Sequence, residues 1–279
     1  VGQSRRIVVR NCRAIENVAG IEIENSVGAD VFENIAHRNS GGILVFDLPG
    51  LDLTNGEGTR VFKNDIRENN HENFAAAGSM VSTIPPGTGL LLLGANRVEV
   101  FDNEFRGNQK THVSIISYNS VVEKWGDEQF DPFTEEIWIH DNDFVEGGKK
   151  PTGGIAKTFA ALAGAPFPDV FWDGVTKPGA KKPTVAFSGN DESMTFVNAD
   201  MARNTPERLE SGKAVVLRDL APHRTKLPAL PAIMLAPHGR SPRETPAAKA
   251  AREAPEKLSE WQLFRSPMRA QVPVEGVVP

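Results

Sequence analysis

The chain has 279 residues, of which 39% are hydrophobic, and it carries a formal net charge of −5. This composition supports a packed core, and the absence of any run of about eighteen apolar residues predicts no transmembrane segment. The mild negative charge, with no basic stripe interleaved with aromatic residues, argues against nucleic acid as a partner. Cys12 is the single cysteine, which excludes an internal disulfide.

A two-part mark recurs through the first half of the chain. Its first part is an Asn that closes an apolar segment, found at Asn34, Asn64, Asn103 and Asn142, with Cys12 in the same place one copy earlier. Five positions further on, the second part is found at Asn17, Asn39, Asn69 and Asn108, with Gly147 in the last copy. The first parts are 22, 30, 39 and 39 residues apart. A repeat of about 22 residues that lengthens by insertions is typical of a solenoid, in which each copy forms one turn.

Apolar residues alternate around each mark, and this period of two predicts strands rather than helical repeats. Val31, Val61 and Val100 stand at one offset before successive marks, so stacked turns would place them in one inward column. An Asn at each bend can bond to the backbone and to the Asn of the next turn. We therefore predict a structural ladder, with Cys12 as a small buried filler at its start. Its members are Asn34, Asn64, Asn103 and Asn142.

Three of the marks read Val-Phe-Glu-Asn, Val-Phe-Lys-Asn and Val-Phe-Asp-Asn. They resemble the repeat of right-handed parallel β-helix proteins, the broad pectate-lyase-like class. The resemblance implies an all-β fold, a right-handed parallel β-helix solenoid of about six turns, with loop insertions and a largely irregular C-terminal tail. The runs 20–26, 41–51 and 87–94 resemble one family of exported β-helix-repeat proteins without assigned activity, which implies an extracellular or periplasmic location.

Three regions are predicted along the chain. Residues 1–200 form the β-helix domain, which we expect to be truncated at its N-terminus. Residues 201–256 are rich in proline and form a linker that is partly extended and partly disordered. Residues 257–279 resemble the opening of a second exported family, often encoded beside the first, and are expected to be the start of a truncated second domain.

The outward positions of one face become apolar where the insertions begin, at Leu44, Phe46, Leu91, Leu93 and Ile116. We expect the insertions 47–58 and 70–87 to fold back over these side chains. Packing beneath the loops is one interpretation of the apolar face, and a hydrophobic ligand groove is the other.

A second outward column is aromatic. It contains Phe32, Phe62, Phe101 and, two residues before the equivalent position of a later copy, Trp138, with the polar residues Glu33, Lys63 and Asp102 beside it. Rings about 4.8 Å apart would form a platform with charged edges, which suits a sugar ring. We therefore predict glycan stacking on these four aromatic residues. The alternative is that the Phe residues stabilise the sheet by cross-strand stacking or lie under the C-terminal segment.

Few residues are candidates for catalysis. His140, Asp141 and Asp143 form the densest titratable group, and lyases and hydrolases on this fold need converging acids and bases. No cofactor and no metal site are predicted. An acidic group at 127–131 has the oxygen ligands that Ca²⁺ takes, but it lacks a recognisable loop spacing, and a solvated acidic loop is the other interpretation.

Two functions remain open. The first is an exported protein that binds or processes a polysaccharide along its lateral face, as a lyase, hydrolase or epimerase if it is an enzyme. The alternative is a non-catalytic structural or protein-interaction solenoid that docks a fused partner domain. Glycan binding needs Phe32, Phe62 and Phe101 exposed, whereas docking would cover them.

Overall fold

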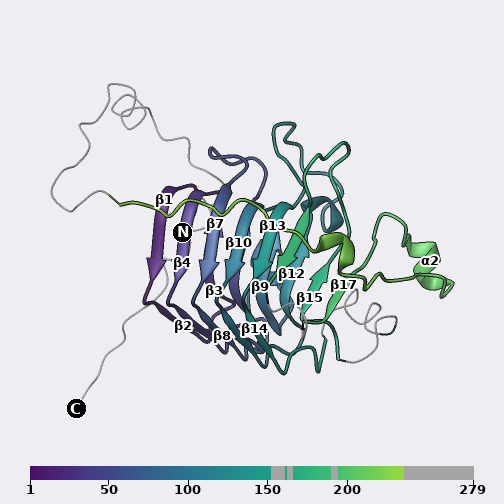
Figure 1. Cartoon of the computed structure of the whole chain (residues 1–279), viewed down its shortest axis with the longest axis horizontal. Coiled ribbons are helices and arrows are strands. Elements are labelled where there is room, and N and C mark those ends of the chain that lie inside the picture. The colour runs from purple at the N-terminus through teal and green to yellow at the C-terminus, as the bar shows by residue number, and fades with distance from the viewer. Residues whose placement is uncertain (152–160, 162–165, 190–193, 236–279) are drawn as a thin grey trace, which may run out of the picture. The chain divides into compact units, whose positions relative to one another are not determined.

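The chain forms a parallel β-helix, in which the strands of each turn stack beside those of the turn before (Figure 1). The computed structural model describes residues 1–151, 161, 166–189 and 194–235. The described strands make three sheets, two with six strands and one with five. The predicted all-β solenoid of about six turns is confirmed.

The first five turns each contribute one strand to each sheet in succession, and β16 and β17 then extend the first and third sheets. The first sheet contains β1 (Arg5–Arg10), β4 (Val27–Phe32), β7 (Glu57–Phe62), β10 (Asn96–Phe101), β13 (Glu135–His140) and β16 (Val185–Ser188). The second sheet contains β2 (Arg13–Ile15), β5 (Ile35–His37), β8 (Asp65–Arg67), β11 (Glu104–Arg106) and β14 (Asp143–Val145). The third sheet contains β3 (Ala19–Glu24), β6 (Gly41–Phe46), β9 (Thr88–Leu93), β12 (Thr111–Ile116), β15 (Val170–Trp172) and β17 (Phe196–Asn198). The short helices are η1 (Met80–Thr83), η2 (Tyr118–Ser120), α2 (Pro206–Glu210) and η3 (Ala221–His223).

The core consists of columns of like residues inside the coil. Val31 pairs with Val61 and Val61 with Val100, and all three side chains are fully buried. The prediction that equal offsets become columns is therefore confirmed. Burying a side chain of this size contributes roughly 1.5–3 kcal/mol. Because each column gains a neighbour with every added turn, the turns stabilise one another.

The residue before each ladder Asn turns the corner between the first and second sheets. Glu33, Lys63 and Asp102 have φ values of 54°, 52° and 53°, which is the left-handed region. A non-glycine residue there costs roughly 1–2 kcal/mol. Their side chains are exposed, so these predicted flanking residues lie at the solvent-facing corner of the coil.

The predicted asparagine ladder follows that corner and is confirmed. The side-chain amides of Asn34, Asn64 and Asn103 each donate to the Oδ1 atom of the next ladder residue, at 3.0, 2.9 and 2.9 Å. The last acceptor is Asn142, and all four side chains are buried. The prediction that Cys12 is buried is wrong. Cys12 is exposed because it lies on the first described turn, where the next turn covers it from one side only.

The second ladder ends in a histidine rather than a further Asn. Asn69 donates to Asn108 at 3.1 Å, and the Asn108 amide lies 3.0 Å from Nδ1 of His112. The next residue of this column is Gly147, where an added Cβ would lie 2.4 Å from Nε2 of His112. The imidazole therefore fills the space that an Asn at position 147 would occupy.

Glycines at the start of the third sheet explain why a histidine at position 112 is combined with a glycine at position 147. Gly42 and Gly89 precede His112 in the same column, and a Cβ at either would lie 2.8 or 2.9 Å from the amide nitrogen of the next turn's Asn. Where the ladder Asn is present, the column tolerates only glycine. Where the ladder has Gly147, the column can hold a large side chain.

The burial of His112 predicts a pH dependence of stability. Burial lowers the pKa of His112 from 6.5 to about 4, although Asp169 raises it in part. The folded state therefore disfavours the proton that the unfolded chain binds below pH 6.5. We expect this contribution to be intact above pH 6.5 and to fall by on the order of 3 kcal/mol as the pH drops to about 4.

Urea unfolding of the wild type and of His112→Asn across this pH range measures the effect. The carboxylates titrate in both proteins, so the difference between the two pH profiles isolates the histidine. Parallel profiles from pH 7 to 4 would contradict the prediction.

The last strand of the solenoid is β17, which ends at Asn198, and the chain after it packs with the solenoid. Residues Val1–Met234 form one compact unit, and this unit includes α2, η3 and the stretch up to Met234 that we predicted as linker. The predicted second domain at 257–279 and the rest of the linker lie outside the described residues.

Candidate ligand pocket

The apolar outer face of the third sheet lies under loops, as expected from the sequence. Leu44, Phe46 and Leu93 form a buried cluster outside the coil with Ile84 of the 70–87 insertion and with Phe130 of the loop between β12 and β13. The loops therefore pack on the sheet at its first turns. Beyond them, between η1 and η2, the cover leaves a pocket.

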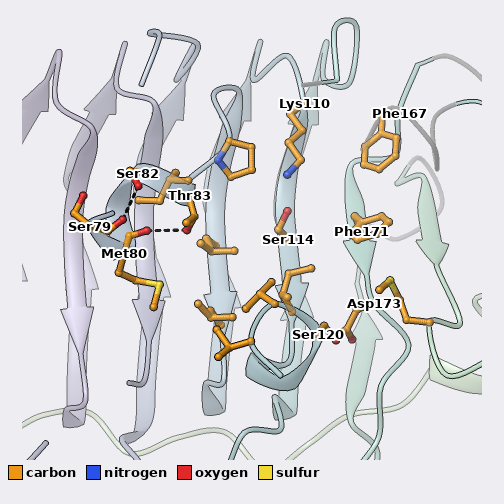
Figure 2. Close-up of a pocket in the computed structure, with 18 of the residues that line it drawn as sticks. Ser79, Met80, Ser82, Thr83, Lys110, Ser114, Ser120, Phe167, Phe171 and Asp173 are labelled. Carbon is orange, nitrogen blue, oxygen red and sulfur yellow. Dashed lines mark hydrogen bonds between the residues drawn. The ribbon is translucent and has the colours of Figure 1, made fainter. Parts of the chain in front are cut away.

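The pocket has a volume of about 660 Å³, a size typical of small-molecule sites (Figure 2). Leu91 and Leu93 of β9 and Ile116 of β12 line it from the sheet. The other apolar lining residues come from the loops, from β15 and from the chain after β17, and are Met80, Ile84, Pro85, Val121, Val122, Phe167, Phe171 and Met201. The predicted groove residues Leu91, Leu93 and Ile116 are thus brought to one cavity.

Two polar side chains, Lys110 and Ser114, reach this apolar space. Lys110 and Ser114 stand just before β12 and on it, and Figure 2 shows the Lys110 amine directed along the strand toward Ser114. The Ser114 hydroxyl is buried and has no hydrogen-bond partner in the described part of the chain. Burial lowers the pKa of Lys110 from 10.5 to about 8, so the amine is largely protonated at neutral pH. A buried donor without an acceptor costs free energy, which an acceptor on a bound ligand would recover.

Asp173 is the acid of the pocket, and its contacts are structural. One carboxylate oxygen accepts from the Ser117 amide at 2.7 Å and from the Ser120 hydroxyl at 2.6 Å, and the other accepts from the Val175 amide at 3.0 Å. Burial raises the pKa of Asp173, and these hydrogen bonds oppose the rise. Asp173 therefore holds η2 against the end of β15 and fixes one wall of the pocket.

The sequence did not single out Lys110, Ser114 or Asp173 as site residues. Lys110 follows the second ladder mark and Asp173 follows a strand more than one turn later. One signal was available: Lys110 and Ser114 share the outward register of Ile116 on an otherwise apolar face. The spacing of the repeats does not indicate that a loop covers Lys110.

The predicted aromatic column forms a continuous stack. The rings of Phe32, Phe62 and Phe101 follow one another at 4.8 Å, with planes within 10° of parallel. His140 continues the stack 5.2 Å from Phe101, and Trp138 lies 4.1 Å from His140. The inner rings cover one another's faces, and all these side chains are half-buried, so they present edges to solvent. Cross-strand stacking is thus present, and glycan binding on the column stays a prediction.

The predicted catalytic group is divided between two sheets. His140 Nδ1 lies 2.7 Å from Asp141 and its Nε2 lies 3.3 Å from Glu99, whereas Asp143 begins β14 of the second sheet. Burial lowers the pKa of His140, but the bonds to Glu99 and Asp141 outweigh it and raise the pKa overall. The cavity that borders His140 measures about 10 Å³, which is room for one water molecule. A catalytic role for these residues stays a prediction.

The acidic group at 127–131 serves loop contacts. Asp127 accepts from the Gly50 amide at 2.9 Å, and Asp131 pairs with Lys177. Within the described ranges, no three His, Cys, Asp or Glu side chains are grouped so that they could hold a metal ion.

The fold and the pocket define a parallel β-helix with a loop-walled apolar cavity. Comparison of the chain with protein-family models, with curated proteins and with solved structures found no match. The resemblance to an exported family, and export itself, therefore stay predictions. In the part of the chain that the structure describes, no helix has the length and apolar character to cross a bilayer.

Proposed function

We propose that the protein binds an amphiphile in this pocket, with an apolar body against β9 and β12 and an anionic head at Lys110. The observation that carries the proposal is the pairing of a cavity of about 660 Å³ with the Lys110 amine and with the buried Ser114 hydroxyl, which has no hydrogen-bond partner among the described residues. An apolar body would bury against Leu91, Leu93 and Ile116. A carboxylate or similar group could accept from both Lys110 and Ser114.

Charge at the head group distinguishes this function from general apolar binding. An anion beside Lys110 favours the protonated amine and raises its pKa, so binding should be strongest below pH 8 and weaken as the amine loses its proton. A neutral ligand of the same length should bind with little pH dependence.

The test compares decanoate with decanol as competitors of the neutral dye Nile red. We expect Lys110→Met to weaken decanoate by about 10- to 100-fold, because one charge-assisted contact is lost from an apolar site. Decanol should change by less than about 3-fold, because methionine keeps an unbranched side chain of similar length without the charge. Leu91→Trp, which fills the cavity, should weaken both.

Two outcomes would contradict the proposal. One is that neither competitor displaces the dye from the wild type at millimolar concentration. The other is that Lys110→Met lowers the two affinities equally, which would make the lysine part of the wall and not a head-group contact.

Polysaccharide binding along the first sheet is a second candidate, and a continuous, half-exposed aromatic column supports it. In this proposal an exported solenoid would hold a glycan against ring edges, with Glu33, Lys63 and Asp102 at the side. A glycan array with the wild type and Phe62→Ala tests it. Binding that depends on Phe62 supports a lateral glycan site, and silence across uronate and neutral polymers contradicts it.

A further inference from the structure

An extended segment crosses the outer face of the first sheet. We call residues 225–233 the strap, and Figure 1 shows this yellow-green stretch running across the strands. The Thr225 amide donates to the carbonyl of Phe187 in β16 at 3.2 Å. At the other end, the Ile233 amide donates to Asp30 Oδ2 in β4 at 3.0 Å. The strap therefore spans from the last strand of the sheet to its second.

The strap meets the sheet with every third residue. Leu227, Leu230 and Ile233 are half-buried, and the residues between them are exposed. Pro228 and Pro231 follow the first two of these apolar residues. A period of three with proline is the pattern of a polyproline II helix, in which one of three faces is turned to one side.

The repeat of the strap matches the repeat of the solenoid. Leu230 donates its amide to Glu99 in β10, and Ile233 donates to Asp30 in β4, with only β7 between these strands. Two strand spacings are about 9.6 Å. Three residues of polyproline II rise about 9.3 Å. Successive inward residues therefore reach equivalent positions two turns apart without strain.

The two acceptors are outward-facing carboxylates that the strap helps to bury. Asp30 and Glu99 are 4% and 5% exposed. Asp30 also accepts from Arg60 at 2.7 and 2.5 Å, and Glu99 lies 3.3 Å from His140. Asp30 is bound by Arg60 through both oxygens, and its Oδ2 also accepts the Ile233 amide. Glu99 has one oxygen near His140, and its other oxygen accepts the Leu230 amide. The face is arranged to receive backbone N–H groups.

We propose that this face is a binding site for polyproline II segments, which the strap fills in cis and a peptide of the same pattern can fill in trans. The partner has an apolar side chain and a free N–H at every third position, with prolines between. Asp30 and Glu99 accept the N–H groups of the peptide. Because these two carboxylates lie two strand spacings apart, a peptide with such a group at every third residue fits them. The proposal is independent of the pocket on the third sheet.

The test uses the full chain with its own strap released by Leu230→Asp and Ile233→Asp, which place charges against the buried carboxylates. A labelled peptide of residues 225–234 is titrated by fluorescence polarisation. We expect a dissociation constant on the order of 10–100 µM for the released variant. The wild type should bind at least about 10-fold more weakly, because its tethered strap competes at a high effective concentration.

Matched peptides test whether Glu99 recognises a backbone N–H of the bound peptide. N-methylation at Leu230 of the peptide removes the N–H that Glu99 accepts and should weaken binding about 10-fold or more. N-methylation at the exposed Ala229 should change affinity by less than about 2-fold. Equal losses from the two peptides would overturn amide recognition by Glu99 and with it the proposal.

The far-ultraviolet circular dichroism of the released variant is measured first. A spectrum like that of the wild type, with peptide binding, supports the proposal. A folded variant that binds no peptide overturns it. A variant that loses its β spectrum also overturns it, because the strap would then be an inseparable part of the fold.

Discussion

Asn64→Ala is expected to lower the free energy of unfolding by about 4 kcal/mol. Its amide donates to Asn103 and to the carbonyl of Val31, both at 2.9 Å, and its Oδ1 accepts the side-chain amide of Asn34 at 3.0 Å. All of these groups are buried, so the substitution leaves several of them unpaired at once. Removing one partner from a buried hydrogen bond costs about 1–3 kcal/mol for each group left behind.

Urea unfolding followed by circular dichroism and by tryptophan fluorescence measures this loss. The matched control is Lys63→Ala at the adjacent exposed corner, which should change stability by less than about 0.5 kcal/mol. A loss below about 1 kcal/mol for Asn64→Ala would mean that water replaces the ladder bonds and that stacked apolar columns alone hold the turns.

Gly147→Asn is expected to destabilise the protein by about 3 kcal/mol or more, even though it restores the residue type of the ladder column. An added Cβ would lie 2.4 Å from Nε2 of His112, inside van der Waals contact. His112 is fully buried between the rings of Phe105 and Phe144, so it cannot move aside without displacing them.

The double variant His112→Gly with Gly147→Asn is expected to recover most of that loss. Glycine then follows Gly42 and Gly89 in its column, and the asparagine introduced at position 147 can accept from Asn108 as the ladder residues before it do. His112→Gly alone should cost about 3 kcal/mol, because it leaves a cavity and an unpaired amide at Asn108. The measurement is a double-mutant cycle in urea, with an expected coupling of about 2 kcal/mol or more in favour of the double variant. Additive losses would show that the two positions do not share one space.

The fold could be predicted because its determinants are local and repeated. Each Asn mark, with alternating residues before it, specifies one strand, one corner and one inward column, and five copies agree. The spacing between marks gave the lengths of the turns, and the apolar outward residues gave the face on which the loops pack. The burial of Cys12 was predicted wrongly because the exposure of a residue in the first described turn depends on how many turns cover it. Its column alone does not give that number.

The pocket and the strap could be predicted only in part. Leu91, Leu93 and Ile116 marked the apolar face, but Lys110 and Asp173 reach the cavity from segments that share no repeat with each other. The strap segment has the composition of a linker, and nothing in its prolines states that a sheet lies beneath it. The match becomes evident only when the rise of three polyproline II residues is compared with the distance across two strand spacings of the sheet beneath.

The sequence by itself determined the repeat, the ladder and the columns of the core, because strand period and bend chemistry act between near neighbours and recur in every turn. Only the tertiary structure decided which outward faces stay open, since a loop or the strap covers a face through contacts between residues far apart in the chain. The volume of the pocket, the lowered pKa of Lys110 and the burial of Asp30 and Glu99 all follow from that covering.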